Sequence, residues 1–231
     1  RIESLGNQLG ERVAKQLAGQ AAGSSEMPEP DLLIRANQQA IHQIDPHWGG
    51  IGGRTKFPSS TPIRFLLRYH RRTGDETSLR LATLTLDQMA NGGLYDQVGG
   101  GFHRYSTDPR WLVPHFEKML YDNALLVPVY LEAAQVTGNE EYRRIAREVL
   151  DYVALEMTAP GGAFYSATDA DSQRPDGEME EGWFFTWTPD ELQTVLGPER
   201  AQVVSKYYGV TPQGNFEGRN ILHRPRSLDA V

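Results

Sequence analysis

Hydrophobic residues recur at helical spacing along most of the chain. One helix face is marked by residues three or four positions apart, namely Leu33, Ala36, Ala40, Ile41 and Ile44. The same spacing, together with the usual end signals, predicts helices over residues 2–17, 31–44, 62–73, 76–89, 114–136, 140–157 and 189–196. We therefore expect an all-α fold.

Capping residues mark several of these helix ends. Thr61 is the expected N-cap before Pro62, and Gly74 is the expected stop of the same helix. Residues 188–191 have the sequence TPDE, which is typical of a capping box with proline at the first helical position. Pro128 lies inside the predicted 114–136 helix and is expected to kink or split it, because proline lacks a backbone N–H.

The chain contains an internal repeat. The sequence TGDETSLRLATLTLDQM from Thr73 matches TGNEEYRRIAREVLDYV from Thr137. Both copies begin with a tight glycine turn and continue as an amphipathic helix, and both end near a double glycine. A repeat of this length indicates a helical hairpin that is used more than once.

Short and long connections alternate along the predicted helices. The turns at Gly74 and Gly138 are very short, whereas the connections 46–60, 92–112 and 159–187 are long and rich in glycine, aromatic residues and charge. In an up-and-down array this alternation places every long loop at one end. The residues expected at this end are His47, Trp48, Lys56, His103, Arg104, Asp169 and Asp171.

Repeated helical hairpins form either an open solenoid or a closed α/α barrel. The long loops at one end favour the barrel, because a solenoid normally has more uniform turns. A six-hairpin barrel needs more helices than this chain supplies. We therefore expect one domain over residues 1–231 that is part of an α/α toroid. The chain begins at Arg1 and looks helical from Ile2, so we also expect it to be a fragment.

Composition narrows the classes of function. The 231 residues carry a net charge of −7, which argues against a nucleic-acid surface. The absence of cysteine excludes disulfides, thiolate nucleophiles and cysteine-based zinc sites, and it fits a cytoplasmic location. No apolar run reaches the length of a membrane span, so we expect no membrane partner.

Candidate chemistry is concentrated between Gly92 and Ala124. This stretch combines glycines with bulky aromatic and ionisable side chains, as concave sites for polar ligands do. His115 and Glu117, in the first turn of the predicted helix, would face His103 and Arg104 and supply an acid, a base and charge stabilisation. Two alternatives remain: an ordered loop packed on a helix end, and a Glu117 that only stabilises the helix dipole.

Two acidic residues extend this picture. In FYSATDADS, Asp169 and Asp171 lie on the same side of an extended stretch, where paired carboxylates bind calcium, act as acid and base, or hold sugar hydroxyls. The segment does not fit an EF-hand loop, and we expect no metal site. The acidic run Glu178, Glu180 and Glu181 is interpreted as a solvated loop. GGGF at 99–102 lacks the ending of a phosphate loop, so no cofactor is expected.

These motifs resemble the large thioredoxin-domain proteins of the YyaL and spermatogenesis-associated protein 20 type. The resemblance rests on GGLYDQVGGGFHRYSTDPRWLVPHFEKMLYDNA at 92–124, KFP at 56–58, GGAFYSATDADS at 161–172, FFTWTPDEL at 184–192 and GNFEGRNIL at 214–222. It implies a thioredoxin-like domain followed by an α/α barrel similar to six-hairpin glycosidases and N-acylglucosamine 2-epimerases. This chain would be the first part of that barrel.

Three hypotheses follow. The first is a carbohydrate-active enzyme, either a sugar epimerase or isomerase or a glycoside hydrolase. Its candidate catalytic residues are His115, Glu117, His103 and Asp169, and its candidate substrate-binding residues are Trp48, Lys56, Arg104, Tyr105, Trp111, Tyr121, Asp122 and Asp171. The second is a non-catalytic module that binds a glycan, or a client protein of the thioredoxin-like domain. The third is a purely structural motif. Exposed faces of a partial barrel would in addition favour a dimer.

Overall fold

The structure is a computed structural model that describes residues 2–21, 29 and 31–225. The chain divides into two compact units, Arg1–Ala36 and Asn37–Val231. The first unit contains helix α1 (Ile2–Ala21), which extends the predicted 2–17 helix, and the beginning of α2 (Asp31–Gln43). The second unit contains all the candidate site residues, and the following description concerns this unit.

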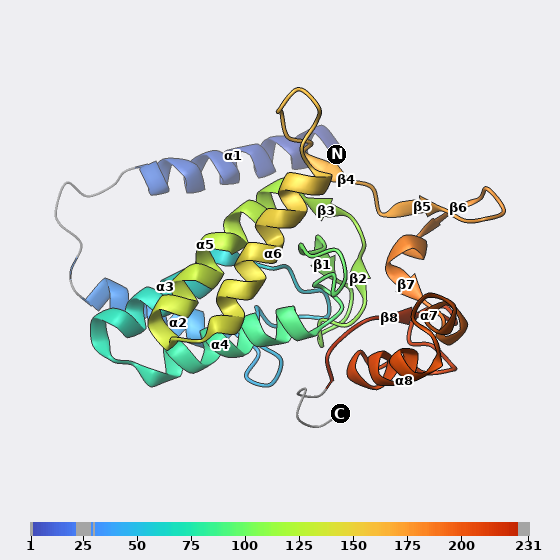
Figure 1. Cartoon of the computed structure of the whole chain (residues 1–231). Coiled ribbons are helices and arrows are strands. Elements are labelled where there is room, and N and C mark those ends of the chain that lie inside the picture. The colour runs from blue at the N-terminus through green and yellow to red at the C-terminus, as the bar shows by residue number, and fades with distance from the viewer. Residues whose placement is uncertain (1, 22–28, 30, 226–231) are drawn as a thin grey trace. The chain divides into compact units, whose positions relative to one another are not determined.

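Helices dominate the second unit, so the predicted all-α fold is confirmed. Four of them, α3 (Ser60–Thr73), α4 (Glu76–Asn91), α5 (Leu120–Thr137) and α6 (Glu140–Glu156), lie beside one another (Figure 1). Helix α3 packs on α4 and α5, and α5 packs on α6. Two further helices, α7 (Pro189–Leu196) and α8 (Pro198–Tyr207), pack on each other on the other side of the long loops.

The long loops contain antiparallel pairs of very short strands. The pairs are β1 (Tyr105–Ser106) with β2 (Pro114–His115), β3 (Lys118–Met119) with β4 (Ala167–Thr168), β5 (Asp171–Gln173) with β6 (Met179–Glu181), and β7 (Thr186–Trp187) with β8 (Asn220–Ile221). A short 3-10 helix, η1 (Trp183–Phe185), connects β6 to β7.

The internal repeat is confirmed as two helical hairpins. Gly74 ends α3 with φ 77° and Gly138 ends α5 with φ 74°, a left-handed conformation that glycine adopts without strain. Asp75 then caps α4 by accepting from Ser78 N, and Asn139 caps α6 in the same way. The Thr-Gly-Asp and Thr-Gly-Asn tripeptides therefore make equivalent turns.

The long loops meet at one end of the helices, as the alternation of connection lengths predicts. Lys56 and Ser106 exchange backbone hydrogen bonds of 2.9 and 2.8 Å, which join the 46–60 and 92–112 loops. Lys118 pairs with Thr168 across β3 and β4, which joins the third loop to the segment before α5. Every candidate site residue in these loops is thereby brought to the same end.

A buried lysine fastens the first loop. Lys56 is fully buried, and its Nζ donates to Asp45 Oδ2 at 2.8 Å and to the Gly49 carbonyl at 2.7 Å. The other oxygen of Asp45 accepts from the backbone N–H groups of His47 and Trp48. The buried ammonium group is thus paired with a carboxylate and a carbonyl, and a buried charge without such partners would be costly.

A second buried lysine fastens the next loop in the same way. Lys118 Nζ donates to Asp96 Oδ2 at 2.8 Å and to the Gly100 carbonyl at 2.8 Å, and Asp96 Oδ1 accepts from Val98 N and Gly99 N. Burial alone would raise the pKa of Asp96, yet the Lys118 ammonium holds it below its usual value. These two lysine clamps form a second internal repeat.

The segment before α5 corrects the prediction of a helix from Pro114. Residues 114–119 are extended, and buried side chains alternate with partly exposed ones along them. The buried positions are Pro114, Phe116 and Lys118. His115 and Glu117 therefore lie on a strand segment and not in a first helical turn, because pairing with residues 105 and 168 holds the backbone extended.

Other helix ends agree more closely with prediction. Thr188 and Glu191 form the predicted capping box, with Pro189 at the first helical position. Helix α3 begins at Ser60, so Thr61 is inside the helix and is not its N-cap. Pro128 does not split α5, which is assigned as one helix from Leu120 to Thr137.

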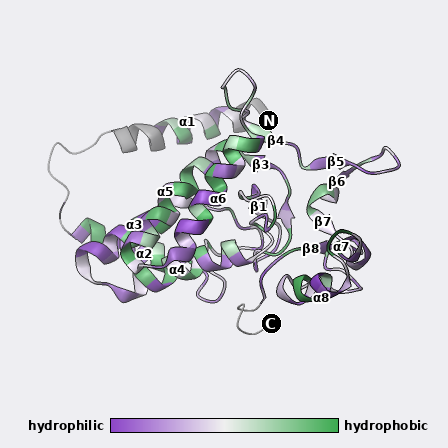
Figure 2. Cartoon of the chain, in the orientation of Figure 1, coloured by the Kyte–Doolittle hydropathy of each residue, from purple (hydrophilic) through white to green (hydrophobic). Residues whose placement is uncertain are grey.

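The main core lies between the four hairpin helices and the loops that cover them. Helix α5 is rich in apolar residues (Figure 2), and it leaves Leu125 and Leu131 exposed. Such uncovered apolar faces are what the dimer prediction rests on, and that prediction stays open. Among the described helices none has the length and apolarity of a membrane span.

Candidate functional site

An arginine and a glutamate form the centre of the loop end. Arg104 Nη1 donates to Glu117 Oε2 at 2.7 Å, and the Arg104 backbone N–H donates to the Glu117 carbonyl at 2.7 Å. The two side chains are held together because β1 and β2 pair just beyond them. The Glu117 carboxylate, followed by nearby Tyr121, raises the pKa of Arg104. The site therefore presents a permanent cation beside a carboxylate.

His115 lies next to this pair, and its ring is oriented by a third residue, Glu181. His115 Nδ1 is 2.8 Å from Glu181 Oε1, so it carries the proton and donates to the carboxylate. The opposite ring nitrogen, Nε2, is 4.0 Å from Glu117 Oε2. Both side chains of the His115–Glu117 contact are about one quarter exposed, at 27% and 25%. In the neutral ring, Nε2 is therefore a proton acceptor within reach of a ligand.

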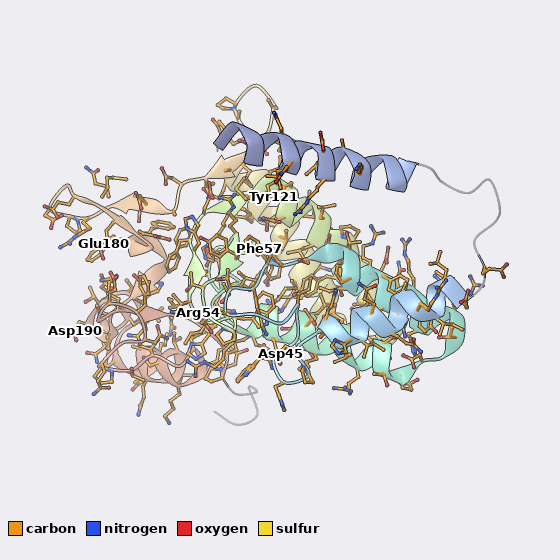
Figure 3. The ribbon with its side chains drawn as sticks, turned by 180° about the vertical axis from the view of Figure 1, so that it is seen from behind. Asp45, Arg54, Phe57, Tyr121, Glu180 and Asp190 are labelled. Carbon is orange, nitrogen blue, oxygen red and sulfur yellow. The ribbon has the colours of Figure 1, made fainter. Side chains whose placement is uncertain are left out.

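Aromatic rings surround these polar groups. Tyr105 packs edge-on against His115 with 5.1 Å between ring centroids, and it also contacts Phe57 with 4.9 Å between centroids. Phe57 is 53% exposed and Tyr121 is 51% exposed. Figure 3 shows both of them, Phe57 at the end of the first long loop and Tyr121 at the start of α5. Exposed rings of this kind provide flat apolar surfaces beside hydrogen-bonding groups.

Asp122 is an unusually weak carboxylic acid at the loop end. Burial raises its pKa to about 6, although nearby Arg104 acts in the opposite direction. The residue lines a hollow of about 350 Å³ together with Tyr121, Ile51 and the start of α3. A carboxyl group with this pKa exchanges protons near neutral pH, as general acids and bases do.

The structure thus brings together one part of the predicted site. We call this set the loop-end cluster; it consists of Arg104, Tyr105, His115, Glu117, Tyr121, Asp122 and Glu181. Six of the seven were predicted from sequence. Glu181 was interpreted as part of a solvated acidic run, and Phe57 beside the cluster was not singled out. Only the pairing of β5 with β6 reveals Glu181, because it turns this side chain toward His115.

His103 lies outside the loop-end cluster. Its Nδ1 is 2.8 Å from the Phe116 carbonyl, and its ring is packed edge-on between Phe116 and Phe185. Burial, followed by the Lys118 charge, lowers the pKa of His103 to about 3. The side chain is therefore neutral and does not face His115 across a common pocket.

Lys56 and Trp111, two of the candidate ligand contacts, are buried and held by other residues. Lys56 is held by its clamp, and Trp111 is fully buried with its Nε1 donating to the Trp48 carbonyl at 2.7 Å. Both side chains are almost fully buried, and their role as ligand contacts stays a prediction. Trp48 itself is 38% exposed, and no hydrogen bond, ion pair or ring contact within residues 31–225 joins its side chain to the loop-end cluster.

The two carboxylates of the DADS segment make no polar contact with the cluster, although Asp171 is the strand partner of Glu181 across β5 and β6. Asp169 and Asp171 are exposed, and their one mutual contact is the hydrogen bond from Asp171 N to Asp169 Oδ1 at 3.1 Å. No hydrogen bond or ion pair between described residues joins either carboxylate to His115 or Glu117. Across the described part of the chain no group of three or more acidic or histidine side chains has the arrangement of a metal site.

Comparison with known proteins gives the relationship of the chain. It is 39% identical to spermatogenesis-associated protein 20 of Homo sapiens over 236 residues, which cover 90% of this chain and 30% of the human protein. The protein of the same name from Rattus norvegicus is 42% identical over the same length. This chain is related to spermatogenesis-associated protein 20. The resemblance seen in the motifs is therefore confirmed, and the chain spans about 30% of the length of these relatives.

The fold has solved counterparts as well. The structure of cellobiose 2-epimerase from Spirochaeta thermophila matches 78% of this chain and 56% of its own length, with a TM-score of 0.51 and 15% sequence identity. At this identity the match establishes a shared fold alone. It confirms the predicted partial α/α toroid. No family profile matches the chain.

Proposed function

We propose that the loop-end cluster binds a sugar and transfers a proton on it, as a sugar epimerase or isomerase does. One observation carries this proposal: Glu181 orients His115 so that Nε2 is open toward the Arg104–Glu117 pair. A base held by a second group, beside a fixed cation, is the arrangement that proton abstraction next to a carbonyl needs.

The surroundings of the cluster suit a sugar ring. Phe57 and Tyr121 offer exposed aromatic faces, and Arg104 and Asp122 offer charged hydrogen-bonding groups nearby. An apolar platform next to a few fixed polar groups matches a molecule with one apolar face and several hydroxyls. The shared fold with a cellobiose 2-epimerase supports the same class of ligand by analogy.

Glycoside hydrolysis is the less favoured form of the enzyme hypothesis. It needs an acid and a second carboxylate on opposite sides of one bond. Two of the three carboxyl groups in the cluster, Glu117 and Glu181, instead contact the same histidine, and the third, Asp122, lines a hollow that neither of them lines. Asp169 would then have to act from a separate exposed loop. Proton transfer by His115 requires no such rearrangement.

A non-catalytic scaffold that binds a glycan or a client protein is the second candidate. The observation that favours it is that Arg104 pairs with Glu117 and His115 pairs with Glu181, so the polar network closes on itself. Against it, the His115–Glu117 contact is part-exposed and not sealed from solvent. Binding without turnover is the outcome that separates the two candidates.

The test is solvent deuterium exchange into sugars, followed by NMR with the protein in its full natural length. A panel of aldoses and disaccharides is compared for wild type, His115→Asn and His42→Asn. Asparagine at 115 keeps a donor toward Glu181 but lacks Nε2, whereas His42 is an exposed residue on α2 outside the cluster. We expect exchange at the carbon next to the carbonyl in wild type and His42→Asn, and a loss of about a hundredfold or more in His115→Asn.

Three results are distinguishable in this experiment. Exchange that depends on His115 supports the enzyme. Saturable sugar binding with no exchange or cleavage supports the glycan-binding scaffold. If wild type neither binds nor alters any sugar, the proposal that the cluster is a sugar site is wrong.

A further inference from the structure

A second cavity lies away from the loop-end cluster. It has a volume of about 690 Å³ and is bounded by the 93–103 loop, η1, α7 and the segment around β8. None of the residues of the loop-end cluster lines it. Cavities that bind small molecules have volumes of about 300–1,000 Å³, so this one is large enough for an organic ligand. We refer to it as the aromatic cavity.

Its walls and mouth are largely apolar. Tyr95, Trp187 and Phe184 contribute aromatic surface. Three apolar side chains from three different segments stand exposed around it: Val98 at 67%, Phe184 at 72% and Val195 at 68%. Exposed apolar groups that converge on one opening are characteristic of a binding site rather than of scattered surface residues.

Most polar groups around the aromatic cavity already have protein partners. Asp96 is bound by Lys118, and Gln97 Nε2 donates to main-chain carbonyls. Arg219 donates to Glu191 and to the Thr186 carbonyl. A sugar needs partners for several hydroxyls at once, and hydroxyls left unpaired would cost affinity. The cavity therefore suits a flat apolar molecule better than a sugar.

One ring nitrogen of a buried histidine makes no hydrogen bond with the described residues. His103 lines the cavity and is 2% exposed, and its Nδ1 proton is committed to the Phe116 carbonyl. Because the imidazole is neutral, Nε2 carries a lone pair and accepts hydrogen bonds. It receives none from any residue that the structure describes. Polar groups of buried residues normally have a partner, and His103 lines the cavity, so a hydrogen-bond donor on a ligand would complete its bonding.

A second acceptor stands at the edge of the same cavity. Asp190 is exposed in the first turn of α7 (Figure 3), and its carboxylate makes no hydrogen bond or ion pair with the described part of the chain. His103 and Asp190 are thus both acceptors, one deep in the cavity and one near its edge. They favour a ligand that donates hydrogen bonds and disfavour an anion.

We propose that the aromatic cavity binds a planar aromatic molecule that carries an N–H or O–H donor and no negative charge, with the donor bound to His103 Nε2. Indole is the simplest probe of this class. 1-Methylindole has the same ring without the donor, and indole-3-acetate adds a negative charge. This site is separate from the proposed sugar site, so either one stands if the other fails.

The experiment measures binding of the three probes by ligand-detected NMR and calorimetry to the protein in its full natural length. Indole is expected to bind saturably and about threefold to tenfold more tightly than 1-methylindole, which is the value of one neutral hydrogen bond. Indole-3-acetate is expected to bind more weakly than indole. His103→Asn keeps a donor toward Phe116 but lacks Nε2, so it should bind indole and 1-methylindole equally.

A substitution at an exposed position tests the same site without altering the buried His103. Val195→Trp narrows the mouth from an exposed position on α7 and should weaken indole binding at least tenfold. Val203→Trp makes the same change at an exposed position of α8 that does not line the cavity, and it should bind like wild type. No saturable indole binding, or binding that Val195→Trp leaves unchanged, would overturn the site. Equal affinity of wild type for indole and 1-methylindole would overturn the role of His103.

Discussion

His115 Nδ1 lies 2.8 Å from Glu181 Oε1, although the two residues are 66 positions apart. The contact exists because β6 pairs with β5, which carries the chain back toward β2. It gives the histidine one tautomer and one ring orientation. Glu181 is in this sense a positioning residue for the proposed base.

Removal of the Glu181 carboxylate should lower the rate of the proposed reaction far more than the stability of the fold. In Glu181→Ala the free energy of unfolding should change by less than about 1 kcal/mol, because the pair is partly solvated. The rate of solvent exchange into a sugar should fall about tenfold to a hundredfold, since His115 loses its orientation. Glu181→Gln, which keeps an acceptor, should recover much of that rate. Glu178→Ala in the same hairpin is the control and should resemble wild type.

Replacement of the buried Lys118 should, in contrast, lower the stability of the fold strongly. Lys118→Met leaves the Asp96 carboxylate buried without its ammonium partner, and we expect a loss of about 3–5 kcal/mol in urea unfolding. The double variant Asp96→Asn with Lys118→Met removes both charges and should recover part of that loss. If the single variant unfolds like wild type, the clamp does not fasten the loop.

Asp122 should make stability depend on pH. Its pKa is about 6 in the folded chain, against about 3.9 for an aspartate in an unfolded chain. The folded chain therefore binds more protons between pH 4 and 6, and its stability should decline as the pH rises through this window. Asp122→Asn should be more stable than wild type by about 1–2 kcal/mol at pH 7 and no more stable at pH 4.

The control for this measurement is Asp151→Asn, an exposed aspartate on α6. Its unfolding free energy should track that of wild type across the same pH range. If Asp122→Asn and Asp151→Asn change the free energy of unfolding by the same amount at every pH, burial of Asp122 is not the cause of the pH dependence of stability. If Asp122→Asn is more stable than wild type at pH 7, this result also agrees with a functional role for Asp122, because active-site groups often lower the stability of the fold.

Two glycines with the same φ should differ in their tolerance of alanine. Gly74 and Gly101 both have φ 77°. A Cβ at Gly74 meets no atom within 4 Å, whereas a Cβ at Gly101 lies 2.5 Å from the Tyr152 ring. Gly74→Ala should cost about 1 kcal/mol from backbone strain, and Gly101→Ala about 3 kcal/mol or more because the ring must move. Equal costs in thermal unfolding would contradict the close packing at Gly101.

Local patterns were enough for the helical hairpins. The turn at Gly74 and its copy at Gly138 are set by residues within a few positions, namely the glycine that ends one helix and the cap that begins the next. The capping box at Thr188 is equally local. The common end of the long loops also followed from sequence, because it depends only on the order of short and long connections.

The segment before α5 could not be assigned from its sequence. Its side chains alternate between buried and exposed, but one of the buried positions is Lys118, so no apolar alternation is visible. The lysine is buried because Asp96 and Gly100 satisfy its ammonium group. The two lysine clamps are not visible in the sequence either, because Asp and Lys are 11 residues apart in one and 22 in the other.

The sequence by itself determined the helical hairpins, their duplication, the end at which the long loops gather and the relationship to spermatogenesis-associated protein 20. These depend on short-range capping, helical periodicity and contiguous motifs. Only the tertiary structure decided which side chains meet at that end. It joined Glu181 to His115, turned His103 toward a separate cavity and buried Lys56 and Trp111. Such pairings depend on strand register and burial between distant segments, which a linear pattern does not specify.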